Sequence, residues 1–154
     1  MRIFFVFLSS LALTAASPAP PAQPAPPLAI SKLANAVVNA SNADDAPSLS
    51  KLYTNDAIVV DEIPPFAWRG AAAGVAWWRS VEAFLNKEHL HIKLVDVRVN
   101  DFQGSADDGY LIQPMTLLEI GKGGPSSETG TLTYTFHKSG GTWLISSQVW
   151  TTKP

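Results

Sequence analysis

Hydrophobic residues recur along most of the chain with one of two spacings, every three to four residues or every second residue. The first spacing predicts helices and the second predicts strands. Over residues 28–42, apolar side chains recur every three or four positions, which is the spacing of one face of an α-helix. The same spacing over residues 70–87 predicts a second, longer helix. Between them, Asp44 or Asp45 followed by Pro47 predicts a short helix, because an acidic cap and a proline in the first turn both favour a helix start.

Strands are predicted where apolar and polar residues alternate, and they follow mainly after the helices. In the segment 89–101 the apolar phase slips, which indicates a β-bulge or a change in the covered face. A turn is expected at 121–127, so that Glu119 and Glu128, which flank it, face solvent. Helices ahead of a largely antiparallel sheet predict an α+β fold, in which a curved sheet and its helices enclose a conical cavity. The predicted strands cover residues 57–61, 66–69, 89–101, 110–120, 128–138 and 142–152.

The N-terminal segment has the order of a secretory signal peptide. Arg2 precedes an apolar run at 3–13 and then small residues, so residues 1–16 are predicted to be removed after Ala16. The run is shorter than the roughly 20 apolar residues that span a bilayer; the alternative is a buried N-terminal helix. Residues 17–27 are rich in proline and predict an extended spacer rather than a ligand for an SH3-type domain. The domain then covers residues 28–154, and the protein is expected to be secreted or periplasmic.

The amino-acid composition excludes several classes of functional site and partner. The chain has no cysteine, which excludes disulfides, thiolate nucleophiles and cysteine-based metal sites. With a net charge of −2 and no basic run, neither nucleic acid nor, once the signal is cleaved, a membrane surface is expected as a partner. His89 and His91 share a strand face if both lie on the strand, but no third ligand is evident, and His89 also fits a helix C-terminus. We therefore expect no metal and no cofactor.

Two stretches carry a resemblance to a known family. They are LYTNDAIVVDEIPPFAWRGAAAGVAWW at residues 52–78 and ETGTLTYTFHKSGGTWLISSQVW at residues 128–150. Their order and spacing resemble the nuclear transport factor 2-like superfamily, which includes ketosteroid isomerase and SnoaL-like proteins. The resemblance implies helices packed on a strongly curved, antiparallel or mixed sheet, a cone-like half-barrel of the cystatin-like α+β roll type. It also implies a homodimer formed through the outer face of the sheet, where Thr131, Thr133 and Thr135 alternate and fit either a solvated face or a wet interface.

Asp61 is the first candidate for chemistry. It follows three apolar residues at the end of a predicted strand, and by resemblance it matches the general base of ketosteroid isomerase. A carboxylate at an apolar pocket has its pKa raised by desolvation, which suits proton transfer from a carbon next to a carbonyl. The alternative is a surface residue that starts a turn. The resemblance places the isomerase's tyrosine near Val37 and its late acid near Thr133 or Tyr134, so true steroid isomerase activity is not expected.

Aromatic residues supply candidates for the pocket wall. Trp68, Tyr110, Tyr134 and Trp150 are predicted to line it, since small-molecule pockets combine aromatic walls with a few polar groups. The alternative is that they are ordinary core residues. The sequence thus predicts an exported domain that binds a small apolar or carbonyl-bearing molecule, as a cofactor-independent isomerase, lyase or hydrolase. The alternative function is a non-catalytic ligand-binding or dimerising interaction domain of the cell envelope.

Overall fold

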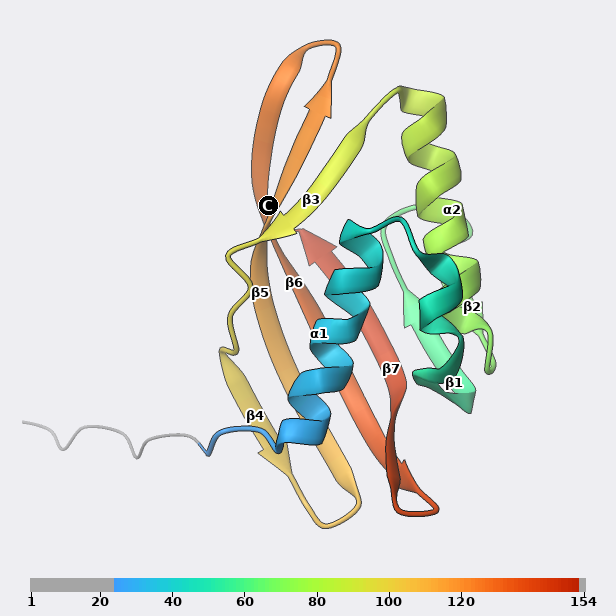
Figure 1. Ribbon diagram of the computed structural model, residues 1–154, viewed down its shortest axis with the longest axis vertical. Helices are drawn as coiled ribbons and strands as arrows, with labels where there is room; N and C mark the ends of the chain where they lie inside the picture. Colours follow the sequence, from blue (N-terminus) through green and yellow to red (C-terminus); the bar gives the residue numbers. More distant parts are fainter. Residues whose placement is uncertain (1–23, 153–154) are drawn as a thin grey trace, which may run out of the picture.

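The computed structural model describes residues 24–152, and this part of the chain forms an α+β fold with helices on one face of an open sheet (Figure 1). The fold class predicted from the sequence is confirmed. The predicted signal peptide at 1–16 and most of the predicted spacer at 17–27 lie outside the described residues.

Three helices precede or interrupt the strands in the described range, close to where the hydrophobic stripes predict them. The side chain of Asp45 caps the short helix by accepting a hydrogen bond from the Ser48 amide at 3.2 Å. The long helix begins three residues later than Gly70, which has a left-handed φ of 89° and bends the chain into the helix. The helices are α1 (Leu28–Asn42), the 3₁₀ helix η1 (Ala46–Lys51) and α2 (Ala73–Glu88).

The described strands form one seven-stranded mixed sheet in the order β2-β1-β7-β6-β5-β3, with β4 paired to the remaining part of the β5 edge. All neighbouring pairs are antiparallel except β1 and β7, the first and last long strands, which run parallel. This pairing brings the end of β1 beside the C-terminal strand (Figure 1). The strands are β1 (Tyr53–Val60), β2 (Ala67–Arg69), β3 (His91–Val95), β4 (Asp101–Gly104), β5 (Asp108–Gly121), β6 (Gly124–Ser139) and β7 (Thr142–Thr152).

The strands differ from the prediction most clearly in two places, apart from β1, which begins four residues earlier than expected. The segment 89–101 is not one strand, because β3 ends at Val95 and the next residue, Asp96, adopts a left-handed φ of 52°. The apolar phase slip marks this break. The turn expected at 121–127 is also wrong, since β5 and β6 stay paired until Gly121 faces Gly124. The hairpin is therefore longer than predicted and extends beyond the rest of the sheet (Figure 1).

The two faces of the sheet have different surroundings. Along β5 and β6 the burial alternates, and the side chains that point toward α1 and α2 are the buried ones. Side chains of the opposite, outer face remain half-buried, and no helix of residues 24–152 packs on it (Figure 1). The largest side chains of the inner core, each less than 2 % exposed, include Trp78, Tyr134, Phe136, Leu111, Met115 and Leu132.

Gly74 fixes how closely α2 approaches β1. A Cβ at this position would lie 2.1 Å from the ring of Tyr53, whose hydroxyl donates a hydrogen bond of 2.6 Å to Oε1 of Gln148 on β7. The ring is held between helix and sheet, so it has no free direction in which to move.

Gly74→Ala is expected to destabilise the domain by about 1–3 kcal/mol, the usual cost of overpacking, although alanine otherwise favours helices over glycine. Urea denaturation of the two proteins measures the difference. Gly123→Ala is the matched control, because nothing lies within 4 Å of the added methyl. Equal midpoints for Gly74→Ala and wild type would contradict the close approach.

Candidate functional site

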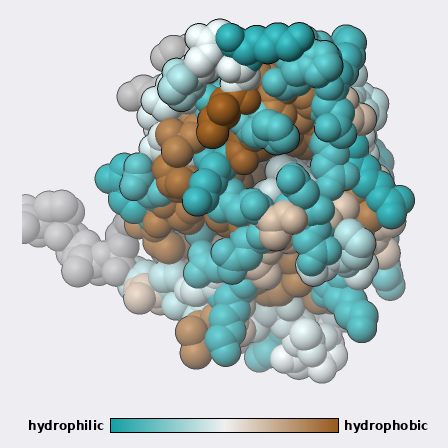
Figure 2. Space-filling view, turned by 45° about the horizontal axis from the view of Figure 1, so that its top comes forward, coloured by the Kyte–Doolittle hydropathy of each residue, from teal (hydrophilic) through white to brown (hydrophobic). Residues whose placement is uncertain are grey.

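A cavity of about 230 Å³ lies between α2 and the inner face of the sheet. Cavities of about 150 Å³ already admit benzene, so this one has room for a ring with substituents. Figure 2, which brings the top of the view in Figure 1 forward, shows hydrophobic side chains surrounded by hydrophilic ones on this side. The wall on the helix side is formed by Trp77, Trp78, Val81, Phe84 and Leu85 of α2.

Asp61 lies in the cavity wall, directly after β1, and is only 9 % exposed. Its Oδ2 accepts a hydrogen bond of 2.6 Å from the indole Nε1 of Trp77, and its Oδ1 accepts one of 3.3 Å from the Ile63 amide. The backbone folds back here, because the Asp61 amide donates to the Phe66 carbonyl at 3.2 Å and the Phe66 amide donates to the Ile63 carbonyl at 2.8 Å. The loop therefore turns the carboxylate inward instead of leaving it in solvent.

Burial raises the pKa of Asp61 above its ordinary value. The hydrogen bonds from Trp77 and Ile63 act in the opposite direction, and the negative charge of Glu62 adds to the rise. A desolvated carboxylate of this kind can accept a proton from a bound molecule. The indole N–H holds one oxygen in place.

Trp150 is the second predicted site residue in this cavity, where it forms part of the sheet-side wall. Its ring rests on the backbone of Gly130 in the neighbouring strand, where a Cβ would lie 2.0 Å from the ring. The glycine therefore permits the flat packing of this aromatic wall.

The other three predicted pocket residues lie elsewhere. Trp68 is buried on β2 beneath α2, where its Nε1 donates to Oγ of Ser80 at 3.1 Å. Tyr134 is fully buried on the inner face but does not line the cavity. Tyr110 points to the outer face of β5, beside a separate shallow depression near β4. The cavity thus brings together Asp61 and Trp150 and leaves these three aside.

The positions that resemblance assigned to the oxyanion donors do not furnish any at the cavity. Val37 is fully buried in the core, and Thr133 alternates with the inward residues of β6 and faces outward. Burial raises the pKa of the Tyr134 phenol, and its hydroxyl has no hydrogen-bond partner within the described residues.

Three glutamates at the rim of the cavity were missed by the sequence reasoning. Glu62 follows Asp61, while Glu119 and Glu128 come from the inner face of the long β5–β6 hairpin. The turn that Glu119 and Glu128 were expected to flank is not there, because β5 and β6 stay paired past both residues. Glu128 is exposed as expected and Glu119 is half-buried, and both side chains also line the cavity. Desolvation raises the pKa of Glu128, and the charges of Glu119 and Glu62 raise it further. The sequence did contain a signal for Glu119. It lies two residues after Leu117, so it falls on the same face of the strand as the inward residues before it.

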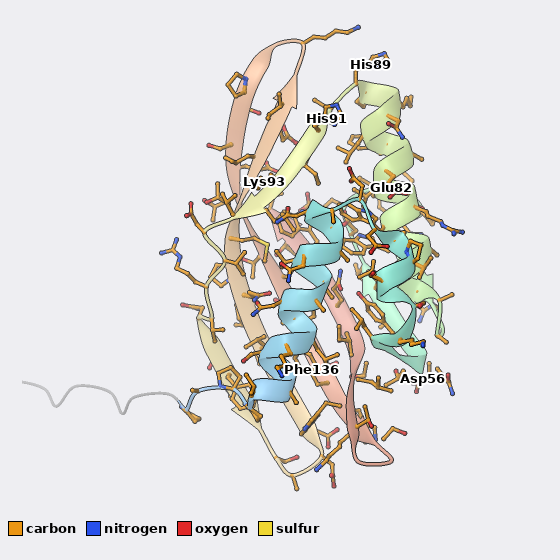
Figure 3. All side chains as sticks on the ribbon, in the orientation of Figure 1. Asp56, Glu82, His89, His91, Lys93 and Phe136 are labelled. Atoms are coloured by element: carbon orange, nitrogen blue, oxygen red, sulfur yellow. The ribbon has the colours of Figure 1, made fainter. Side chains whose placement is uncertain are left out.

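The histidines do not form a metal site. His89 caps the C-terminus of α2 in a left-handed conformation with φ 55°, while His91 lies on β3 (Figure 3). They therefore do not share a strand face, which corrects that expectation. Across the residues that the structure describes, no three histidine or acidic side chains are grouped to hold a metal ion.

Comparison with known proteins identifies the family. A family model described as a SnoaL-like domain matches residues 30–150. The chain belongs to the SnoaL-like domain family. The resemblance to this superfamily inferred from the sequence is confirmed. A search of the curated proteins found no significant match.

Solved structures share the fold of this SnoaL-like domain. A ketosteroid isomerase-like protein from Erwinia carotovora atroseptica aligns with a TM-score of 0.66 and 20% identity, over 82% of this chain and 95% of that one. The hexachlorocyclohexane dehydrochlorinase LinA-type3 from Novosphingobium barchaimii gives a TM-score of 0.66 and 16% identity, over 82% and 85%. An NTF2-like protein with a cystatin-like fold from Novosphingobium aromaticivorans gives 0.62 and 17%, over 79% and 78%. None of the described helices of the SnoaL-like domain is long and apolar enough to cross a membrane.

The pH dependence of stability tests the state of Asp61. Because its folded pKa is raised, the folded state binds the proton more tightly than the unfolded state, and this contribution to stability is lost as pH rises through the folded pKa. Asp61→Asn removes the titration. Its free energy of unfolding should therefore rise relative to wild type between pH 4 and 8, as measured by urea denaturation at each pH. The exposed Asp56 on β1 provides the control Asp56→Asn, and a difference for Asp61→Asn that is flat across this range would contradict the buried placement.

Proposed function

We propose that this SnoaL-like domain binds a small, largely apolar, carbonyl-bearing molecule and uses Asp61 as a proton acceptor, as a cofactor-independent isomerase or lyase. The observation that carries the proposal is the buried Asp61 carboxylate, hydrogen-bonded to Trp77 in the wall of an apolar cavity. A base in such a place meets a ligand's C–H bonds without competition from bulk water.

The division of hydrogen bonds at Asp61 supports this role. Oδ2 accepts a hydrogen bond of 2.6 Å from the Trp77 indole, whereas Oδ1 accepts the longer one of 3.3 Å from the Ile63 amide. One oxygen is therefore held firmly, and the other is the better candidate to take a proton. Such positioned bases typically contribute about 10²–10⁴ to a rate.

Trp78 supplies a candidate donor for the carbonyl of the ligand. Its side chain lines the cavity, is 1% exposed, and its indole N–H has no hydrogen-bond partner within the described residues. A buried donor of this kind is stabilised when a ligand oxygen accepts from it. Because the isomerase's tyrosine and acid have no counterpart at the cavity, we assign the donor role to Trp78.

The names of two structural neighbours refer to reactions of the proposed class. A dehydrochlorinase removes hydrogen and chloride from its substrate, and the other neighbour is named for its likeness to a ketosteroid isomerase. Both reactions begin or end with movement of a proton at carbon. With identities of 16% and 20%, these neighbours support the choice of reaction class through the fold alone.

The second candidate is a binding domain without catalysis. The observation that favours it is the position of Tyr110 and Tyr134, neither of which reaches the cavity as a hydrogen-bond donor. Without a strong donor for a developing oxyanion, ligand binding need not lead to turnover.

Exchange of protons next to a ketone separates these two functions. Wild-type protein in D₂O is expected to accelerate deuterium uptake at the α-carbons of 2-tetralone, followed by NMR, because Asp61 would remove and return the proton. Asp61→Asn should lower the enzymatic rate by about 10²-fold or more. Trp143→Phe is the control, since Trp143 lies at the β6–β7 hairpin beside Lys138 and does not line the cavity.

Three results are distinguishable. Exchange that depends on Asp61 supports catalysis. Binding of 2-tetralone, detected by tryptophan fluorescence, without exchange favours the binding domain. Neither binding nor exchange with a panel of ketones would count against the pocket function as a whole.

The protein is proposed to be exported and to form a homodimer. Residues 1–16 direct the chain out of the cytoplasm to a secreted or periplasmic location. The outer face of the sheet is the surface for self-association, because its half-buried side chains mix threonines with Ile112 and Pro114 of β5. Such a mixed face suits an interface with trapped water.

Sedimentation equilibrium of the domain is expected to give a dimer mass, and Ile112→Lys is expected to give a monomer. Ile112 pairs with Thr133 near the middle of the outer face, so a lysine there places a charge in the interface. Lys51→Ala, on the exposed end of η1, is the control for a change of charge away from the sheet. A wild-type protein that stays monomeric at high concentration would rule out this interface.

A further inference from the structure

The cavity combines an apolar interior with an uncompensated negative rim. Its polar lining includes the carboxylates of Asp61, Glu62, Glu119 and Glu128, and no lysine, arginine or histidine lines it. Within residues 24–152, the ion pairs are Lys87 with Glu88 and His137 with Asp108. The four carboxylates of the cavity therefore lack a cationic partner in the described chain.

The three glutamates form a row along the mouth. On the inner face of the β5–β6 hairpin, Glu119 pairs with Ser126 and Glu128 pairs with Leu117, so the two glutamates are diagonal neighbours on adjacent strands. Diagonal positions of this kind lie about 7–8 Å apart. The Oγ of Ser126 donates to Glu119 at 3.2 Å, which holds that carboxylate on the hairpin.

Glu62 closes the row from the other side. Its carboxylate accepts hydrogen bonds from the amide and hydroxyl of Thr152, at 2.8 and 2.9 Å. Thr152 pairs with Gly130, which lies two residues from Glu128 on the same face of β6. The row thus runs from the loop after β1 across the end of β7 to the hairpin.

Behind this row the walls are aromatic. Trp77, Trp78, Phe84 and Trp150 all line the cavity. The faces of aromatic rings carry partial negative charge and attract cations, most strongly for tryptophan. The negatively charged rim and the aromatic wall therefore both favour a cationic group on the ligand.

We propose that the cavity selects ligands with an apolar body and one ammonium group, so that the body enters between α2 and the sheet while the cation meets the carboxylate row. This rests on the proposed pocket function and names its ligand class: a small primary or quaternary amine that also carries the apolar part. The lysine of β3, Lys93, alternates with the inward Ile92 and Leu94 and does not line the cavity, so it does not neutralise the row. Anionic ligands of the same size are excluded by the same charges.

Isosteric ligands test the charge selection directly. Benzyltrimethylammonium and neopentylbenzene have the same shape and differ by one positive charge, and 3-phenylpropionate is an anion of similar size. Binding is measured by tryptophan fluorescence and calorimetry at neutral pH and low salt. The cation is expected to bind about tenfold more tightly than the neutral isostere, and the anion is expected not to bind.

Neutralising the rim should remove the preference. The double variant Glu119→Gln, Glu128→Gln is expected to bring the ratio of cation to neutral affinity close to one. Asp56→Asn is the matched control, because it removes a carboxylate at the opposite end of the domain (Figure 3) and should keep the wild-type ratio. Circular dichroism of each variant verifies that the domain is folded.

The outcomes distinguish this inference from the pocket function. Tighter binding of the cation that depends on the glutamates supports it. Equal or tighter binding of the neutral isostere overturns the amine class and leaves the pocket in place. If none of the three compounds binds while 2-tetralone does, the amine class also fails. If no compound of either experiment binds, the inference and the proposed function fall together.

Discussion

The hydrogen bond from the Trp77 indole to the Asp61 carboxylate is the interaction on which the cavity depends. It joins the loop after β1 to the first half of α2, and at 2.6 Å it holds a buried carboxyl group that has no cationic partner among the described residues. A desolvated carboxylate is costly unless hydrogen bonds satisfy it. The inward position of Asp61 therefore costs the folded domain some stability.

The rest of the fold determines where Asp61 and Trp77 lie. Parallel pairing of β1 with β7 sets Asp61 near the end of the C-terminal strand, where Thr152 anchors Glu62 and Trp150 forms the opposite wall. Two close approaches without a Cβ make the geometry possible, Gly74 against Tyr53 and Gly130 against Trp150. Below the cavity the core is conventional, with helices covering one face of a twisted sheet.

The cavity of this SnoaL-like domain is marked by its carboxyl groups. The fold is shared with a ketosteroid isomerase-like protein and a dehydrochlorinase, but a fold does not specify a substrate. Here the Asp61 carboxyl group sits behind a row of glutamates, and each negative charge raises the cost of ionising the next carboxyl group. A cationic ligand would lower that cost for all of them, so ligand binding and the ionisation of the rim are coupled.

The sequence by itself determined the fold class, the helices and most strands, because their hydrophobic periods are local and survive in any context. It also singled out Asp61 and Trp150, at the end of one strand and in the last strand. It could not separate Trp150 from Trp68, Tyr110 and Tyr134, because the face of a strand that meets the cavity is set by the register of strand pairing. In the β6–β7 pair this register shifts between Thr135 and Phe136. The Trp77 contact spans a loop and a helix turn, and the glutamate row spans three separate segments. Only the tertiary structure decided these, because strand pairing and the packing of α2 on the sheet bring together residues that are distant along the chain.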